Sequence, residues 1–429
     1  MTRPMVVVGF VSSAPATLAL TEPDRSVIVV EEPDVVRKRG VRDRVAGAAV
    51  VRDLIEWEFH RPGTADEFAN AHPDLDPCAV VPLTEYATPF AARLAERYRR
   101  PGAGYGAALI LRDKALLRQV TRAAGIANPD SAAVSGPEDV LAFMDRHPGP
   151  VVLKPANRQA AVGTRILRDR ATVPAAWAAC VRQDEGALVP DRGFELRMLA
   201  ERCVEGTEFS VEMLVRAGEP LFTNVTGKQL FPGPYPVESG HVVPSGAPAA
   251  LSDRLAADTS RVLAAVGFAD GIVHCEWIVS GGVPYLVECA GRFAGDGIVE
   301  LIQRAYEMEL ARAYYAVLKG TPVPELPRSP RKAAAVRFLS AGAGVVAAIS
   351  GTEAATAADG VFHCAVDVAV GDRHGGLRSS WDRVGEVMVT ADGPAEAVHR
   401  ADAAAALITL DIRTDAPDPT PVPTGVGTP

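Results

Sequence analysis

The stretch YLVECAGRFAGDGIVEL, residues 285–301, decides the fold. Its first three residues read as the end of a buried strand. Glu288, Arg292 and Asp296 follow at intervals of four residues, in a turn rich in glycine and other small residues. A solvated loop is one explanation of these alternating charges. A site for a metal ion and an anion is the other, and the rest of the sequence has to decide between them.

The bulk composition excludes several classes of protein. A chain of 429 residues is too long for one ordinary core and predicts several domains. The net charge of −9 argues against a nucleic-acid surface, which should be basic. No run of 18 apolar residues occurs, so no membrane span is expected. The six cysteines form no CxxC pair, which favours reduced thiols in a cytoplasmic protein over zinc or disulfides.

The pattern of strands and helices divides the chain. The N-terminus could mimic a signal peptide, but VVVGF followed by SVIVVEE fits the first two strands of a parallel α/β domain better. Residues 298–320 predict one long helix, and a Pro-rich linker follows it. The expected parts are an α/β domain at 1–106, units at 107–193 and 194–320, a small α+β unit at 332–414, and a disordered Pro-rich tail at 415–429.

The segment HCEWIVSGGVPYLVEC, residues 274–289, reads as a hairpin. Glu276 and Glu288 are twelve residues apart, so a hairpin centred near Gly282 would oppose them on one face, with Cβ atoms about 4.5–5.5 Å apart. Like charges so placed repel, and a divalent cation between them would make the contact favourable. Oxygen ligands suit Mg²⁺. A solvent-facing pair or a different register is the alternative, and His274 is expected to pack or hydrogen-bond rather than bind metal.

Two lysines are candidates for binding phosphate. Lys154 ends the apolar strand VVLKP and precedes a small, polar loop, and Lys114 lies near the start of a helix. A snorkelling lysine and a helix-surface lysine are the simpler explanations. VTGKQ lacks the residues of a P-loop. GAGVVA at 342–347 matches a GxGxxA fingerprint, which leaves a nicotinamide oxidoreductase as a distant alternative.

In this order, these segments resemble the ATP-grasp superfamily, and within it the carboxylate–amine ligases, especially the L-amino-acid (dipeptide) ligases. The motifs that carry the resemblance are RDKALLRQVTRAAGI, VVLKPA, ERCVEGTEFSVEML, HCEW and VECAGRFAGDG. It covers about residues 1–415. It implies an α/β and α+β multidomain ATP-grasp fold with a Rossmann-like pre-ATP-grasp domain, a lid subdomain with a flexible phosphate loop, a catalytic subdomain and a small C-terminal ligase-type domain.

The resemblance also implies roles for single residues on the nucleotide side. Lys114 and Lys154 would hold the ATP phosphates, and loop 157–164 would close over them. Glu201 and Val204 would meet the adenine, and Glu208 the ribose. Lys228 would approach the γ-phosphate during catalysis, and Glu276 and Glu288 would ligate one or two Mg²⁺ ions, or Mn²⁺. Many relatives carry an asparagine where this chain has Ala290, which cannot ligate.

On the substrate side, Arg292 would bind the carboxylate and the acyl phosphate that it becomes. Glu238, His241, Gly295 and Asp296 are the further candidates, with Asp296 suited to an ammonium group. The implied activity is ATP-dependent amide formation between amino-acid-like substrates, in a cytoplasmic enzyme that could form a homodimer. A biotin-carboxylase-type enzyme that uses bicarbonate, and a non-catalytic ATP-binding sensor or scaffold, are the alternatives. The sequence does not identify the carboxylate or the amine.

Overall fold

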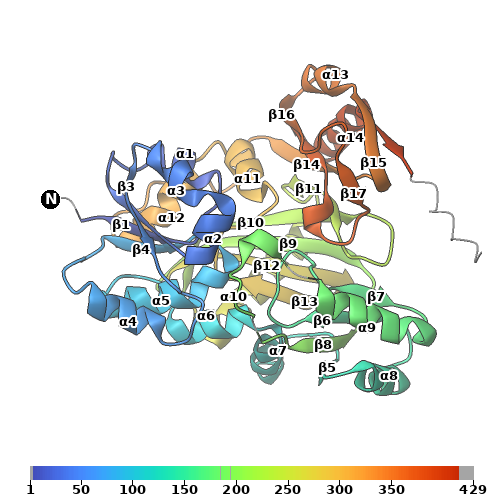
Figure 1. Ribbon diagram of the computed structural model, residues 1–429, viewed down its shortest axis with the longest axis horizontal. Coiled ribbons are helices and arrows are strands. Elements are labelled where there is room, and N and C mark those ends of the chain that lie inside the picture. Colours follow the sequence, from blue (N-terminus) through green and yellow to red (C-terminus); the bar gives the residue numbers. More distant parts are fainter. Residues whose placement is uncertain (1–2, 184, 194, 415–429) are drawn as a thin grey trace, which may run out of the picture.

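The computed structural model describes residues 3–183, 185–193 and 195–414. The tail expected to be disordered, residues 415–429, lies outside them. Figure 1 shows the N-terminal α/β part on the left, the lid subdomain at the lower right and the C-terminal unit at the upper right, around a central sheet. The mixed α/β architecture expected from the sequence is confirmed.

The N-terminal domain is a parallel sheet with strand order β3-β2-β1-β4. The valine-rich strands β1 and β2 are buried along their whole length, as expected where helices cover both faces. Successive residues of β1 alternate between two cores: Val6 and Val8 face one, and Met5 and Val7 the other. The strands are β1 (Met5–Val8), β2 (Val27–Glu31), β3 (Val51–Glu56) and β4 (Ala79–Pro82). The helical elements are α1 (Ala14–Ala19), α2 (Pro33–Arg39), α3 (Val41–Ala46), α4 (Thr64–Ala71), η1 (Glu85–Ala87) and α5 (Thr88–Arg97).

The lid subdomain is a small antiparallel sheet in the order β5-β8-β6-β7, backed by α8 and α9. β8 lies beyond the expected boundary at residues 193 and 194, yet it pairs with β5 and β6 of the lid. The strands are β5 (Ser131–Val134), β6 (Val151–Pro155), β7 (Arg165–Leu167) and β8 (Met198–Arg202). The helices are α6 (Tyr105–Arg112) and α7 (Lys114–Ala123), which precede the lid, and α8 (Pro137–Arg146), η2 (Arg170–Thr172), α9 (Val173–Arg182) and η3 (Gly186–Leu188) within it.

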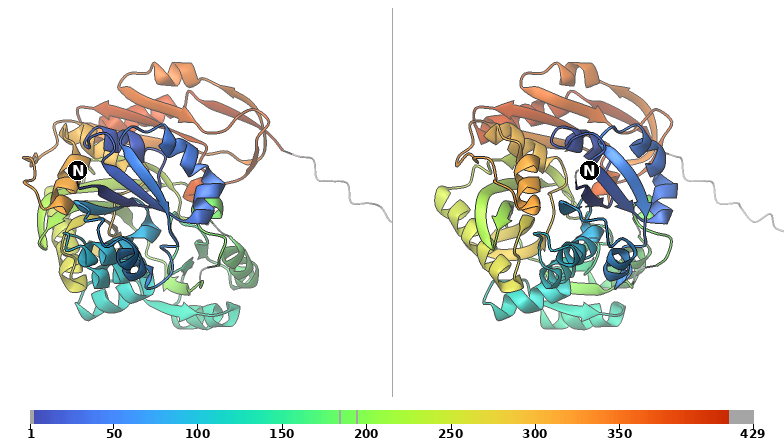
Figure 2. Two further views of the ribbon diagram at one scale, coloured as in Figure 1. Left: turned by 60° about the vertical axis from the view of Figure 1, so that its left-hand side comes forward. Right: turned by 90° about the vertical axis from the view of Figure 1, so that its left-hand side faces the viewer.

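An eight-stranded antiparallel sheet forms the centre, in the order β13-β12-β9-β10-β11-β14-β18-β16. Its last three strands belong to the C-terminal unit, so this unit continues the catalytic sheet through the pairing of β11 with β14. Figure 2 shows these C-terminal strands lying across the top of the molecule. The strands are β9 (Thr207–Arg216), β10 (Glu219–Leu230), β11 (Glu238–Val243), β12 (Gly271–Ser280), β13 (Val283–Ala290), β14 (Ala333–Leu339), β16 (Val361–Val366) and β18 (Gly385–Ala391).

Helix α10 (Ala249–Val266) packs on one face of this sheet, where it shares a core with α6 and α7. On the other face, α11 (Ile298–Tyr306) and α12 (Leu310–Lys319) share a core with the N-terminal sheet and with β14. The expectation of one long helix over residues 298–320 is wrong. Glu307 adopts a left-handed conformation with φ of 51° and ends the first helix, so the chain changes direction before the second begins.

The C-terminal unit adds a three-stranded sheet of β15 (Ala343–Ser350), β17 (Arg373–Gly375) and β19 (Thr409–Arg413), with α13 (Thr352–Thr356), α14 (Pro394–Ala405) and η4 (Ser380–Asp382). The GAGVVA segment forms strand β15 rather than a strand-to-helix turn, so it is not a dinucleotide fingerprint. Within the described residues, no helix is both long and apolar enough to cross a membrane.

Candidate active site

A cavity of about 1070 Å³ opens where the N-terminal sheet, the lid and the central sheet meet. Its size exceeds that of an ordinary single-ligand pocket, so it has room for more than one small molecule. Eleven of the residues singled out in the sequence line it: Lys114, Lys154, Glu201, Val204, Glu208, Glu238, Glu276, Glu288, Arg292, Gly295 and Asp296. Lys228 and His241 lie directly behind this wall, in contact with lining carboxylates.

The hairpin β12–β13 brings two carboxylates face to face, as the sequence predicted. Glu276 and Glu288 are directly paired in the register. The turn, however, is the two-residue pair Gly281–Gly282, with φ of 56° and 79°, so pairs near it join residues of opposite parity. A β-bulge between Glu276 and Trp277 shifts the register by one residue and creates the Glu276–Glu288 pair.

A buried polar network holds the Glu276 carboxylate in position. Lys228 Nζ donates to Glu276 Oε1 at 2.5 Å, and His274 Nε2 lies 3.1 Å from the same oxygen. The other ring nitrogen of His274 lies 2.9 Å from Glu212 Oε1. Burial alone would lower the pKa of His274, but the hydrogen bonds to these two carboxylates outweigh it and raise the pKa to about 10. His274 is therefore a charged hydrogen-bonding residue, as expected, and holds Glu276 in place.

The Glu288 carboxylate lies beside the start of α7. Lys114 Nζ is 2.8 Å from Glu288 Oε2 and also donates to the backbone carbonyl of Arg158 at 2.9 Å. The Asp113 side chain caps α7 by accepting from the N–H groups of Ala115 and Leu116, which places Lys114 in the first turn. A lysine in a first helical turn, aimed at a carboxylate, is well placed for a phosphate group.

The paired carboxylates fit Mg²⁺ that arrives with a polyphosphate. In the described part of the chain, no cluster of three or more His, Cys, Asp or Glu side chains could hold a metal on its own. Mg²⁺ is commonly bound by one or two carboxylates plus phosphate oxygens and waters, and Glu276 and Glu288 match that donor set. Ala290 is buried and pairs with His274, so it adds no ligand.

At the end of the cavity beside the lid, called the nucleotide end because the sequence predicts nucleotide binding there, β6 and β8 hold a buried charge cluster. Lys154 Nζ lies 2.6 Å from Glu201 Oε2, and Arg118 Nε donates to Glu201 Oε1 at 2.9 Å. Burial raises the pKa of Glu201, but these two cations outweigh it and hold the pKa at about 2. Burial raises the pKa of Glu208 to about 7, although the charges of Lys228 and Lys154 oppose this rise. Val204 lines the same end of the cavity.

Loop 157–164 lies between Lys114 and the C-terminal unit. Arg112 donates to the Asn157 carbonyl at 2.6 Å, and the Ala160 carbonyl accepts from the backbone N–H of Ser380 at 3.2 Å. Ala160 and Ala161 both have positive φ, 55° and 56°, a conformation that favours glycine. The loop therefore reaches across the cavity and touches η4.

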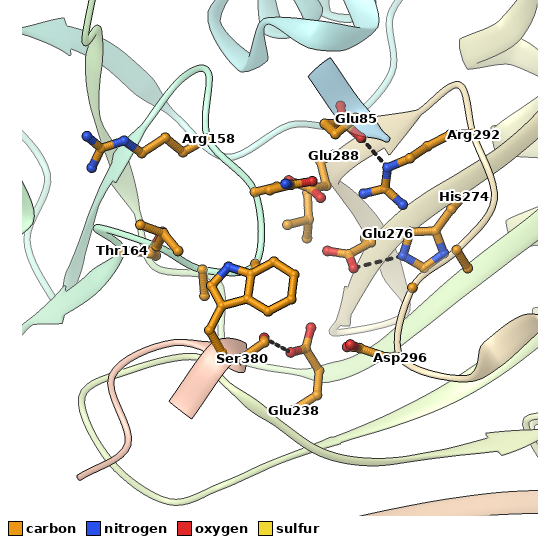
Figure 3. Close-up of a pocket in the computed structure, with 18 of the residues that line it drawn as sticks. Glu85, Arg158, Thr164, Glu238, His274, Glu276, Glu288, Arg292, Asp296 and Ser380 are labelled. Atoms are coloured by element: carbon orange, nitrogen blue, oxygen red, sulfur yellow. Dashed lines mark hydrogen bonds and ion pairs between the residues drawn. The ribbon is translucent and has the colours of Figure 1, made fainter. Parts of the chain in front are cut away.

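The end of the cavity around Arg292 is called the substrate end, because the sequence predicts substrate binding there. Arg292 is positioned by the N-terminal domain. Its Nε donates to Glu85 Oε2 at 2.6 Å, and its NH1 donates to the Phe293 carbonyl at 2.6 Å. Glu85 belongs to η1, directly after strand β4. Burial raises the pKa of Glu85, but Arg292, Arg112 and Lys114 outweigh it and lower the pKa. Figure 3 shows Arg292 and Glu288 approaching the cavity from neighbouring segments.

The C-terminal unit completes the other side of the substrate end. Arg383 donates to both carboxylate oxygens of Asp296, which itself has a left-handed φ of 58°. Burial opposes ionisation of Asp296, but His241 and Arg383 outweigh it and lower its pKa. Lys228 Nζ lies 3.1 Å from one carboxylate oxygen of Glu238, and the other oxygen accepts a hydrogen bond from Ser380 Oγ, also at 3.1 Å (Figure 3). Asp296 thus lines the cavity already paired with an arginine.

Sequence reasoning missed the residues that reach the site from distant segments. Glu85 carried one usable signal, because it closely follows the strand that became β4, at the edge of the parallel sheet where ligands bind. Ser380, Trp381 and Arg383 follow no motif and gave no signal. Arg118 was missed because a fully buried arginine in a helix resembles a surface residue until its partner Glu201 is known.

Comparison with known proteins first gives the class of protein. Residues 147–300 match the family described as ATP-grasp domain. A crystal structure of an L-amino acid ligase from Bacillus licheniformis superposes with a TM-score of 0.74 at 16% identity, over 96% of this chain and 99% of that one. The protein therefore has the ATP-grasp fold, as the sequence resemblance implied.

The C-terminal unit then gives the narrower relationship. Residues 337–413 match L-amino acid ligase C-terminal domain 2. The alanine–anticapsin ligase of Bacillus subtilis (strain 168) is 24% identical over 53% of this chain and 51% of its own length. An L-arginine-specific L-amino acid ligase of Bacillus subtilis is 26% identical over 49% and 50%. The chain thus contains an ATP-grasp domain and a C-terminal domain of the L-amino acid ligase type, and it spans about half the length of these curated relatives.

Proposed function

We propose that this protein is an ATP-dependent carboxylate–amine ligase that joins two amino-acid-like substrates through an amide bond and releases ADP and phosphate. The observation that carries the proposal is one continuous cavity in which the opposed pair Glu276–Glu288 lies between the Lys154 cluster and Arg292. This arrangement provides for a polyphosphate, its metal ion and a carboxylate side by side.

The residues on the nucleotide side bind ATP and neutralise the charge of its phosphates. Lys114 and Lys154 receive phosphate oxygens, while Val204 and Glu201 line the wall proposed for adenine, and Glu208 the wall proposed for the ribose. Bound Mg²⁺, held by Glu276 and Glu288, would supply charge neutralisation for phosphoryl transfer. Burial lowers the pKa of Lys228, but three carboxylates outweigh it and raise the pKa well above its usual value, so Lys228 stays cationic beside Glu276.

On the substrate side, Arg292 orients the carboxylate for transfer of the γ-phosphoryl group. The C–O⁻ oxygen of the substrate attacks phosphorus, the bond to ADP breaks, and an acyl phosphate forms. The amine then attacks the carbonyl carbon, phosphate leaves, and the amine nitrogen loses a proton. Arg292 can stabilise the developing oxyanion because it lines the cavity and its guanidinium is held in place by Glu85 and by the Phe293 carbonyl.

Water must be kept away from the acyl phosphate, which it would hydrolyse. Loop 157–164 spans the cavity from Arg112 to Ser380, so it covers the position of the transferred group. The match of residues 337–413 to the L-amino acid ligase domain favours a ligase over a biotin-carboxylase-type enzyme. The intact set of Lys154, Glu276, Glu288 and Arg292 favours turnover over a purely sensory role.

The test is ADP formation by the full chain with ATP and Mg²⁺ and a matrix of carboxylates and amines, with amide products detected by mass spectrometry. We expect ADP only where both substrates are present, and a product mass equal to their sum minus water. ADP formation that depends on bicarbonate and not on an amine would support the carboxylase instead. Tight ATP binding with no turnover on any pair would support the sensor.

A further inference from the structure

An exposed tryptophan lies on the wall of the cavity, and the proposed roles above do not use it. Trp381 is 53% exposed and lines the same cavity as Glu276 and Arg292. Trp277 is buried, and the remaining two tryptophans are partly buried, so this is the most solvent-accessible indole of the four. An exposed indole leaves a large apolar surface in water, which is unfavourable unless a ligand covers it.

The backbone around Trp381 is anchored on both sides. Ser379 and Asp382 form a reciprocal capping box around η4. Ser380, on one side, binds Glu238 through its hydroxyl and the Ala160 carbonyl through its N–H. Arg383, two residues further on, pairs with Asp296. The indole is therefore carried on a fixed turn that joins the C-terminal unit to the catalytic sheet.

The position of this turn separates it from the adenine wall. Its neighbours Glu238 and Asp296 lie at the substrate end, and Lys228 connects Glu238 to Glu276. The proposed adenine wall, Glu201 and Val204, belongs to the lid at the other end of the nucleotide site. The turn that carries the indole is therefore bonded to the wall proposed for the substrates and not to the wall proposed for adenine.

We propose that Trp381 is a specificity-determining residue that binds the side chain of the amine substrate by stacking, and that the preferred amine is an amino acid with an aromatic side chain. The proposal rests on the proposed ligase function and names the substrate class of that same site. The indole supplies a flat apolar face, and Glu238 and Asp296, which bond the residues on either side of it, line the same cavity.

Aromatic stacking explains the residue better than a structural role does. A structural tryptophan would be buried in one of the hydrophobic cores, as Trp277 is. Within the described residues, Trp381 belongs to none of those cores, although its flanking residues are firmly bonded. The turn is stabilised by its polar contacts, which leaves the indole available for a ligand.

The experiment compares Trp381→Ala and Trp381→Phe with wild type in the full chain. KM is measured for phenylalanine, leucine and alanine as amines, with one fixed carboxylate substrate, and Kd is measured for ATP. We expect Trp381→Ala to raise the KM for phenylalanine at least 10-fold, to change the KM for alanine less than 2-fold, and to leave the Kd for ATP unchanged. Trp381→Phe should restore most of the affinity for phenylalanine. Val370→Ala, an exposed position of the same unit that does not line the cavity, is the matched control.

Binding of the amine can also be measured without turnover. Indole fluorescence of wild type should change on titration with phenylalanine in the presence of a non-hydrolysable ATP analogue, and Trp381→Phe should lose this change. An equal rise of KM for all three amines, or a selective effect on a basic amine such as arginine, would overturn the proposal. If wild type forms no ADP with any pair, the proposed function fails, and the fluorescence titration still decides whether Trp381 binds the aromatic amine.

Discussion

The two ends of the cavity are built in different ways. At the nucleotide end, the buried cluster of Lys154, Glu201 and Arg118 comes from three elements, α7, β6 and β8, that lie within one stretch of about a hundred residues. At the substrate end, Arg292 is held by Glu85, 207 residues earlier, and Asp296 by Arg383, 87 residues later. The first end is built from one continuous stretch of the chain, and the second depends on the docking of three distant segments.

This difference predicts how the ends respond to change. A cluster whose members bond one another within one stretch of the chain depends little on distant segments, so nucleotide binding should tolerate changes elsewhere. A site shared between domains changes whenever their docking changes. Substrate preference should therefore respond to substitutions that leave ATP binding intact. Separate measurements of KM for the substrates and Kd for ATP test this independence.

The largest effect is expected in the middle, where the ends meet. Glu288→Gln removes one carboxylate of the metal pair while keeping its shape, and it should lower kcat by about 10³-fold, because bound metal contributes several kcal/mol of charge stabilisation. ADP release with saturating substrates and a Mg²⁺ titration measure it. Glu219→Gln, an exposed glutamate at the start of β10, is the control. Turnover at the wild-type rate would show that this pair does not hold the metal.

The next effect is a dependence of stability on pH with opposite signs for different carboxyls. Burial raises the pKa of Glu31, the last residue of β2 and part of the cavity wall, to about 7. Its contribution to stability is therefore complete below about pH 4.5 and is lost as the pH rises through 7. Glu31→Gln should match wild type at pH 5 and exceed it at pH 8 by up to about 3 kcal/mol.

Glu201, at the nucleotide end, provides the opposite case. Its pKa of about 2 means that its stabilisation is present above about pH 4.5 and is lost as the pH falls toward 2. Glu201→Gln should therefore be less stable than wild type at pH 8, and the deficit should shrink in acid. Denaturant unfolding at pH 5 and pH 8 measures Glu31→Gln, and unfolding at pH 3 and pH 8 measures Glu201→Gln. A change of the same sign with pH in both variants would contradict the charge environments of these two carboxyls.

The residues that the sequence predicts for the nucleotide lie together on the cavity wall because they belong to local motifs, and their binding roles stay predictions. VVLKPA and VEGTEFSVE each place a functional residue at a recognisable point on a strand. The Glu276–Glu288 pair was also predicted, but the parity argument was incomplete. A Gly281–Gly282 turn alone would have paired Glu276 with Val287, and only the bulge, which the sequence does not reveal, corrected the register.

The substrate end could not be predicted to the same depth. Asp296 was interpreted as a partner for an ammonium group, and its binding role stays a prediction, but its pairing with Arg383 depends on how the C-terminal unit docks. The pattern of residues 298–320 is helical throughout, and it does not predict the left-handed backbone conformation of Glu307. Tertiary packing against the N-terminal sheet decides both features.

A moderate effect is expected where two domains share one ion pair. Glu85→Gln weakens the charge-assisted hydrogen bond to Arg292, which should raise the KM for the carboxylate substrate by about 10- to 100-fold, in line with about 1.5–3 kcal/mol for such a bond. The Kd for ATP should change much less than this KM, because Glu85 bonds Arg292 directly and acts on Lys114 only through its charge. Glu96→Gln, in α5 of the same domain, is the control. A parallel loss of ATP affinity would mean that the two ends are not separate.

The smallest effect tests whether η4 couples the ends at all. Ser380→Ala removes the hydroxyl bond to Glu238 but keeps the backbone bond to Ala160, so only one of its two links is lost. A bond of this kind contributes about 1 kcal/mol, so the KM for the amine should rise by about 5-fold at most. ATP affinity, measured by calorimetry, should not move. If it weakens as much as amine binding, the hydroxyl also positions loop 157–164, and the C-terminal unit then governs both ends of the cavity.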